Sequence, residues 1–218
     1  MLRVFSPDQM MMAIDVDAAG ATLPKGAVWI DMIRPTRAEE LFIETAVGIG
    51  VPTLEEMDEI ETSSRLYTEN GATYMTATVA TGIFKQDAET HAVSFILTPA
   101  HLITVRYAEV LSFDRFAGHA ERSPVLCESA GMALVHLLDT VVDRLADGIE
   151  HIGKEVDAIS RQAFRRARPA GQQRMTNLAL QSLLGRLGTA QDGLSKARDS
   201  AVSLNRALGY LAFAAPKS

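Results

Sequence analysis

The sequence WIDMIRPTRAEELFIETAVGIGVPTLEEMDEIETSSRLYTE, residues 29–69, decides the fold. Together with the two residues before it, its largely apolar start predicts a β-strand over residues 27–33. Segments 36–39 and 53–56 both have the sequence Thr-x-x-Glu, the capping-box pattern that opens a helix. A Ser-Ser-Arg turn follows the second helix and leads into another strand. The first half of the chain is therefore predicted to be a mixed α/β structure.

The strands expected downstream form hairpins. Asn70-Gly71 stands between the strand-like segments 65–67 and 72–84, and both turn positions of such a hairpin need positive φ angles. Two more β-rich segments follow at residues 93–98 and 102–106. About five strands flanked by helices predict an α/β (α+β) fold, an α/β/α sandwich with a mixed sheet.

The second half changes character after Ser123-Pro124, where we expect a helix to start. Apolar residues then recur at steps of three and four over residues 134–163 and again over residues 180–211. Two such stripes, separated by a Pro-Ala-Gly break at residues 169–171, predict a long antiparallel helical hairpin. We divide the chain into a mixed α/β sheet domain, 1–122, and the hairpin, 123–218, and expect them to form one compact unit.

Composition excludes several classes of function. The chain has 218 residues and a formal net charge of −6, which argues against nucleic-acid binding because that usually needs a basic face. No targeting segment opens the chain, and no apolar run reaches the roughly 20 residues of a membrane helix, so we expect a soluble polypeptide. The single cysteine cannot form an internal disulfide and fits a reducing compartment.

Carboxylates dominate residues 39–61, where eight Asp or Glu residues occur without a Lys or Arg. Such a segment creates a field that attracts cations. Glu55 and Glu56 lie in the first turn of the predicted short helix, so they are candidate ligands for a divalent cation. The alternative is that they only stabilise the N-terminus of that helix through its dipole.

A second acidic group lies on the first long helix. Asp139, Asp143, Asp147 and Glu150 follow steps of four, four and three, so they share one helical face. Without an answering cation this pattern indicates a solvated helix face.

No catalytic machinery can be assembled from the motifs. The five histidines have no His-x-His or His-x-x-x-His spacing, so a dedicated zinc site is not expected. Cys127 has no nearby histidine, and no glycine-rich phosphate loop is present. We therefore predict that the protein is not an enzyme.

Several motifs, in order along the chain, resemble the cytosolic domain of CorA-family magnesium transporters. The matching segments are WID at 29–31, PT at 35–36, PTLEE at 52–56, ETSSR at 61–65, LITVR at 102–106 and the helix 137–160. The family continues into a stalk helix, two membrane helices and a Gly-Met-Asn motif, none of which is expected in these residues. The resemblance thus implies magnesium transport for a longer parent, and no ion flux by this segment alone.

The resemblance also implies a function and its ligands. It suggests a cytosolic regulatory domain that senses divalent cations and gates the pore by binding Mg²⁺ between subunits, with Co²⁺ as a second candidate ion. Glu55 and Glu56 match the family's sensing pair, and Asp139 matches a position in a second cation site of some members. The implied partner is the chain itself, as a homo-oligomer that is pentameric in the full-length protein.

The implied location is the cytoplasmic side of the inner membrane, reached through the C-terminal segment of the parent. Two alternatives stay open at this point: a zinc-transporting relative of the same family, and a coiled-coil scaffold protein built on the helical hairpin.

Overall fold

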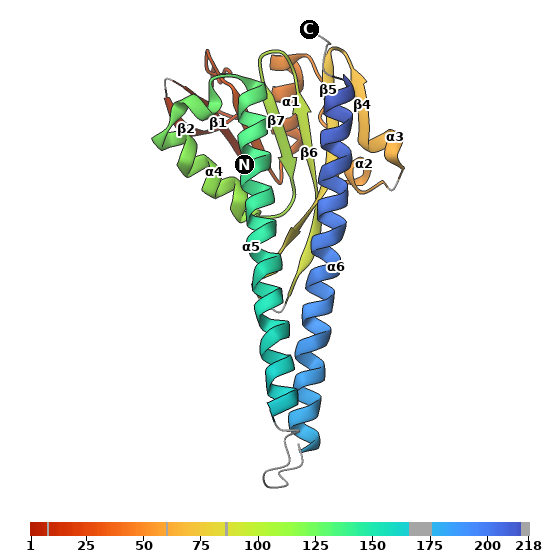
Figure 1. The fold of residues 1–218 in the computed structure, drawn as a ribbon. Coiled ribbons are helices and arrows are strands. Elements are labelled where there is room, and N and C mark those ends of the chain that lie inside the picture. The colour runs from red at the N-terminus through yellow and green to blue at the C-terminus, as the bar shows by residue number, and fades with distance from the viewer. Residues whose placement is uncertain (8, 60, 86, 166–175, 215–218) are drawn as a thin grey trace.

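A seven-stranded mixed sheet forms the middle layer of the protein (Figure 1). The computed structural model describes residues 1–218 except 8, 60, 86, 166–175 and 215–218. The strands are β1 Leu2–Ser6, β2 Gln9–Ile14, β3 Trp29–Ile33, β4 Leu66–Glu69, β5 Ala72–Thr81, β6 Glu89–Leu97 and β7 Leu102–Arg106. They lie in the order β2-β1-β3-β7-β6-β5-β4. Strands β3 and β7 run parallel and the other neighbouring pairs antiparallel, which confirms the mixed sheet.

Helices cover both faces of the sheet and confirm the α/β/α sandwich. The helices are α1 Arg37–Val47, α2 Leu54–Asp58, α3 Thr62–Arg65, α4 Leu111–Arg122, the 3₁₀ helix η1 Pro124–Cys127, α5 Ala130–Arg165 and α6 Asn177–Ala214. One apolar cluster joins α1 and α2 to one face of the sheet, and a larger cluster joins α4, α5 and α6 to the other. Because side chains alternate along a strand, the neighbours Trp29 and Ile30 belong to different clusters.

The turn between β4 and β5 has the predicted form. Asn70 and Gly71 have φ angles of 49° and 75°, as a two-residue hairpin requires. Strand β4 begins only at Leu66 and pairs only with residues 72–75 of β5. Beyond it, serines of α6 accept hydrogen bonds from the open edge of β5: Thr78 N donates to Ser203 Oγ (2.8 Å) and Ala80 N to Ser200 Oγ (3.2 Å). The long helix therefore closes an edge that would otherwise expose unpaired backbone groups.

The long helical hairpin is confirmed, but its start differs from the prediction. Pro124 opens a four-residue 3₁₀ helix, and the 36-residue α5 begins only at Ala130. Ser123 is the N-cap residue of this 3₁₀ helix and makes no side-chain cap hydrogen bond. Helix α4 and the N-terminal strands β1 and β2 were not predicted. The expected break at 169–171 lies outside the described residues.

Two sequence motifs meet in a buried ion-pair cluster between β3 and β7. Asp31 is completely buried and accepts hydrogen bonds from Thr104 Oγ1 (2.9 Å) and from Arg106 Nε (3.1 Å) and Nη2 (2.9 Å). Arg3 of β1 donates to the same carboxylate at 2.6 Å. Trp29 Nε1 donates to Thr104 Oγ1 at 3.1 Å. The WID and LITVR motifs thus encode a structural joint of the sheet rather than a ligand site.

Candidate divalent-cation site

The short helix α2 is fixed to the sheet by one side chain and one cap. Met57 is fully buried in the cluster below α2. The backbone N of Glu56 donates to Thr53 Oγ1 (3.3 Å), and the Glu56 carboxylate accepts from Thr53 N (2.8 Å), which completes the predicted capping box. Glu56 therefore caps the N-terminus of α2. This is the stabilising role that the sequence analysis gave as the alternative to cation binding.

Glu55 and Asp58 are also exposed on α2, and unlike Glu56 they take no part in the capping box. None of the ion pairs between described residues involves Glu55, Glu56 or Asp58. The surface of α2 therefore carries negative charge without a basic partner there, which is the local field expected to attract cations.

The negative charge of residues 39–61 is not uniform along the segment, because the carboxylates of α1 have basic partners. Arg37 pairs with Glu40 (3.0 Å) and lies 3.7 Å from Glu44. The N-terminal ammonium of Met1 pairs with Glu39 at 3.0 Å. The expectation of eight uncompensated carboxylates was wrong for these three, since their partners lie just before the segment and at the chain terminus. The uncompensated charge is concentrated on α2 and the residues after it.

Asp139 lies on the other side of the sheet. It is an exposed residue of α5, whereas α2 packs on the opposite face. One chain therefore does not bring Asp139 together with Glu55 and Glu56, and a site that uses all three would need a neighbouring copy. Asp139 instead borders a cavity of about 210 Å³ that is also lined by His119, His136 and Asp143.

The remaining acidic residues of that helix behave as a solvated face. Asp143 and Asp147 are exposed, and Glu150 forms an exposed pair with Lys154 (2.8 Å) that lowers the pKa of the glutamate. Across the described residues, no three His, Cys, Asp or Glu side chains are arranged to hold a metal ion. A single chain thus offers at most a partial, two-carboxylate site.

Such a partial site fits Mg²⁺ better than a softer metal. Mg²⁺ takes oxygen ligands, keeps several of its waters and is often bound through one or two carboxylates. Glu55 and Glu56 supply oxygen ligands on one short helix, with no histidine or cysteine beside them in sequence. They would hold a hydrated ion weakly.

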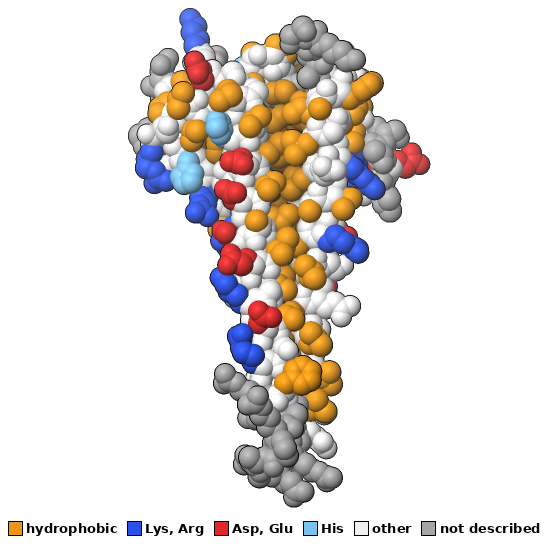
Figure 2. Space-filling view, viewed as in Figure 1, with side chains coloured by type: hydrophobic (Ala, Val, Ile, Leu, Met, Phe, Trp, Pro, Cys, Tyr) orange, Lys and Arg blue, Asp and Glu red, His pale blue; other side chains and the backbone are white. Residues whose placement is uncertain are grey.

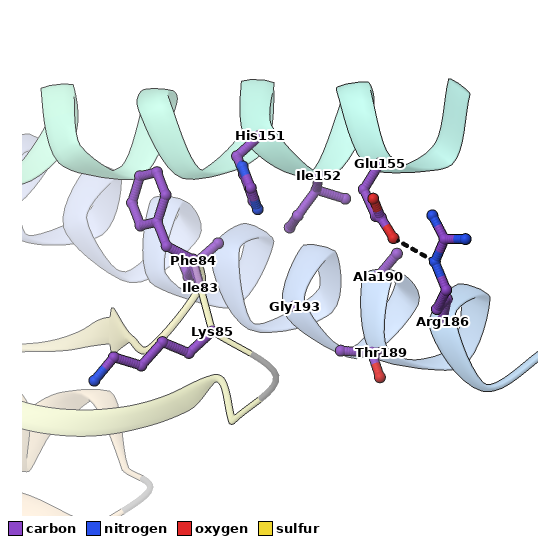
Figure 3. Close-up of a pocket in the computed structure, with 10 residues that line it drawn as sticks. All are labelled: Ile83, Phe84, Lys85, His151, Ile152, Glu155, Arg186, Thr189, Ala190 and Gly193. Carbon is purple, nitrogen blue, oxygen red and sulfur yellow. Dashed lines mark hydrogen bonds and ion pairs between the residues drawn. The ribbon is translucent and has the colours of Figure 1, made fainter. Parts of the chain in front are cut away.

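A cavity of about 220 Å³ lies between the β5–β6 connection and the helical hairpin (Figure 3). Arg186 Nε donates to Glu155 at 2.7 Å across it, and the His151 ring lies 5.5 Å from the Phe84 ring. The Arg186 hydrogen bond lowers the pKa of Glu155. Glu155 and Arg186 neutralise each other, and apolar side chains such as Ile83 and Ile152 line the rest of the contact, so we interpret this cavity as a packing junction between the hairpin and the sheet.

The single cysteine has the environment of a structural residue. Cys127 is fully buried, and burial raises the pKa of its thiol to about 12. A thiol with that pKa is almost entirely protonated near neutral pH and is a poor nucleophile.

Comparison with known proteins adds the family. A model of the family described as "CorA-like Mg2+ transporter protein" matches residues 24–211, most of the chain. The chain belongs to the CorA family. The resemblance drawn from the sequence motifs is thereby confirmed, and the family is one of transporters.

Among curated CorA proteins, the magnesium transport protein CorA of Escherichia coli K12 is 30% identical over 139 residues, which are 62% of this chain and 43% of the relative. The CorA of Salmonella typhimurium LT2 is 29% identical over the same length. The chain thus spans less than half the length of these relatives. Within the described residues, no helix combines the length and apolarity needed to cross a bilayer.

Solved structures confirm the fold of this CorA-family domain. The soluble domain of CorA from Methanocaldococcus jannaschii aligns over 97% of this chain and 95% of its own, with a TM-score of 0.59 at 13% identity. The full-length CmaX protein aligns over 97% of this chain and 72% of its own, with a TM-score of 0.57 at 13% identity. At this identity the likeness concerns the fold alone.

The structure explains motif residues whose role could not be read from the sequence. Arg65, the end of the ETSSR segment, donates through Nε to the carbonyl oxygen of Glu59 and through Nη1 to Thr78 Oγ1 (3.3 Å). It ties the connection after α2 to strand β5 and so holds the acidic segment against the sheet. The sequence signal for this role is that Arg65 is the first basic residue after the acidic residues 55–61.

Proposed function

We propose that this CorA-family chain is the cytosolic, cation-sensing regulatory domain of a CorA-type magnesium transporter. The observation that carries the proposal is the short helix α2. It is pinned by Met57, capped by Thr53, and carries Glu55 and Asp58 exposed and without an ion pair among the described residues. Relatives named as magnesium transport proteins make Mg²⁺ the cation of choice, with Co²⁺ as a second candidate.

The site is completed by a neighbouring copy of the chain. Because Asp139 lies on the opposite face of the sheet from Glu55 and Glu56, the two groups meet only when two copies pack side by side in a ring. A hydrated cation between them relieves the repulsion of the carboxylates and holds the copies together. Removal of the cation restores the repulsion, loosens the ring and opens the pore. In the full-length homo-oligomer, this domain lies on the cytoplasmic side of the membrane.

The coiled-coil scaffold alternative has support of its own, since the hairpin helices are 36 and 38 residues long. It does not account for the uncompensated carboxylates of α2, whereas cation sensing does. The zinc-transporting alternative concerns the ion that the parent carries, and it would keep the same regulatory role for this domain.

Thermal melting tests the proposal. We expect millimolar Mg²⁺, compared with EDTA, to raise the melting temperature modestly. A ligand at 100 times its Kd adds about 2.7 kcal/mol, and a partial site gives less. Glu55→Gln combined with Glu56→Gln should abolish the response, because glutamine keeps the cap hydrogen bond but removes the charge.

The matched control is Asp147→Asn, which removes a carboxylate from the solvated face of α5 and should leave the response intact. A double variant that responds to Mg²⁺ as the parent does would mean that Glu55 and Glu56 are helix caps only.

A further inference from the structure

An open pocket of about 410 Å³ lies where α6 covers the edge of β5. Arg65 lines it from the end of α3, and Arg198 and Arg206 line it from α6. Asp199 is the one carboxylate among the described residues that line it. Figure 2 shows Lys or Arg side chains on the border of α6 that is turned away from α5. We call this site the arginine pocket.

The arginine pocket has an excess of positive charge. Among the ion pairs between described residues, Arg198 with Asp199 (3.2 Å) is the one that involves a residue of the pocket. Arg65 contacts uncharged acceptors, a backbone carbonyl oxygen through Nε and Thr78 Oγ1 (3.3 Å) through Nη1. The guanidinium charges of Arg65 and Arg206 therefore have no carboxylate partner within the described part of the chain. A pocket with this charge attracts anions.

Two hydroxyl groups add neutral donors beside the arginines. Thr78 Oγ1 accepts a hydrogen bond from Arg65 Nη1, and Ser203 Oγ accepts one from the backbone N of Thr78 (2.8 Å). A hydroxyl group has one hydrogen to donate besides its two lone pairs. Within the residues that the structure describes, neither hydroxyl donates to another group. Both hydrogens are therefore available to an acceptor bound in the pocket.

The sequence of α6 places these groups on one face of the helix. Arg198, Val202 and Arg206 follow one another at steps of four, and Ser203 is next to Val202. The two arginines are thus two turns apart, about 12 Å along the helix axis, with Val202 between them. Two long side chains at this spacing can reach one small ion from opposite sides, while Arg65 reaches it from the side of the sheet.

We propose that the arginine pocket binds a phosphate group. The guanidinium fork binds phosphate oxygens through paired hydrogen bonds, and clusters of arginine are a recurring way to recognise phosphate. A phosphate ester carries a charge of about −1.5 to −2 near pH 7, which matches two unpaired guanidinium groups better than a single carboxylate does. Its remaining oxygens accept the hydrogen bonds of Thr78 and Ser203.

Inorganic phosphate and the phosphate of a small ester, such as a nucleoside monophosphate, share this chemistry. The volume of about 410 Å³ falls within the range of roughly 300–1,000 Å³ that is usual for small-molecule sites, so the pocket has room for either. The arginine pocket is separate from the carboxylates of α2, and the proposal does not depend on cation sensing.

Equilibrium dialysis against radiolabelled phosphate tests the proposal on the 218-residue chain. EDTA is kept throughout, so that no divalent cation bridges phosphate to the protein. We expect saturable binding of one phosphate per chain at millimolar or lower concentration. A parallel dialysis against radiolabelled AMP separates the two sources, because the natural ligand should be chemically nearer to the one that binds more tightly. Saturable binding of neither ligand would overturn the proposal.

Arg206→Gln is the diagnostic variant. Arg206 is exposed, so its substitution should leave the fold intact, as checked by circular dichroism. The variant should bind phosphate roughly tenfold more weakly, because a charge-assisted hydrogen bond is lost. Arg206→Lys keeps the charge without the fork and should recover only part of that loss. Binding by Arg206→Gln as tight as that of the parent would overturn the proposal.

The matched control is Arg161→Gln, which removes the same charge from an exposed position near the end of α5. Its neighbour Gln162 contacts Arg186, which lies about 30 Å along α6 from Arg206. The control should therefore bind phosphate as the parent does. If Arg161→Gln and Arg206→Gln weakened the binding equally, phosphate would respond only to the overall charge of the chain, and the assignment to the arginine pocket would be wrong.

Discussion

The buried carboxylate of Asp31 offers a sharp test of what holds the sheet together. Asp31 is fully buried, and its two oxygens receive hydrogen bonds from Thr104, Arg106 and Arg3. Asp31→Asn keeps the shape of the side chain but removes the only fully buried negative charge of the cluster. Arg106, 1% exposed, would then lose its charged partner and one of its two acceptor oxygens at residue 31, because the amide nitrogen of asparagine cannot accept a hydrogen bond. Its other contacts are the carbonyl of Ala108, the ring of Phe113 and a distant approach to Asp114.

Loss of one partner from a buried pair costs about 3–5 kcal/mol, because an uncompensated charge stays in the interior. In a domain of this size, that corresponds to a decrease in melting temperature of roughly 6–20 °C. Urea unfolding followed by circular dichroism measures the loss directly, and an unchanged slope would show that the denatured state is unaffected.

The matched control is Asp114→Asn. Asp114 also pairs with Arg3 (3.0 Å), but its side chain is 48% exposed, so its removal should cost less than about 1 kcal/mol. If Asp31→Asn were no more destabilising than Asp114→Asn, the cluster would not be the joint of the sheet that we infer.

Three further predictions follow from single positions. Cys127, with its thiol pKa raised to about 12 by burial, should not react with a thiol reagent at pH 8 until denaturant is added; prompt labelling of the folded chain would contradict its burial. Gly82 has a φ of 67°, and a Cβ at this position would collide with the backbone carbonyl of Asp87. Gly71 has a φ of 75° but open space around it, so Gly71→Ala should lose only about 1–2 kcal/mol, which is what a left-handed backbone costs a residue with a Cβ. Gly82→Ala should therefore destabilise the fold more than Gly71→Ala, and equal urea midpoints of the two variants would refute this. Burial raises the pKa of Tyr67 from 10.0 to about 12, so the protonated phenol contributes its full free energy of unfolding below pH 10 and loses it as the pH rises towards 12. Tyr67→Phe should therefore make the free energy of unfolding, measured by urea titration, fall less between pH 10 and about 12. A variant whose free energy of unfolding falls as steeply as that of the parent would contradict this.

The elements that the sequence predicted well are those with strong local signals. Both capping boxes, the Asn70-Gly71 turn and the two apolar stripes are encoded within a few neighbouring residues, and each appears as expected. The missed elements lack such signals. Strand β1 starts at the second residue, and α4 begins after Val110, which makes no side-chain cap hydrogen bond.

The candidate site was harder to predict because its meaning depends on distant residues. The sequence grouped eight carboxylates, but only the fold brings Arg37 and the Met1 ammonium onto those of α1. The WID and LITVR motifs are 70 residues apart, and only the parallel pairing of β3 with β7 joins Asp31 to Arg106. The placement of Asp139 on the opposite face from Glu55 likewise requires the layer order of the sandwich.

Mg²⁺-dependent association, measured by sedimentation velocity, tests the central claim most directly. If the cation binds between copies, the parent chain should sediment faster in millimolar Mg²⁺ than in EDTA. The double variant Glu55→Gln/Glu56→Gln and the single variant Asp139→Asn should each lose this increase in sedimentation rate when measured alone. Mixed together they should regain part of it, because one copy then supplies the glutamates and the other the aspartate. An identical sedimentation profile of the parent in Mg²⁺ and in EDTA would contradict cation sensing between subunits.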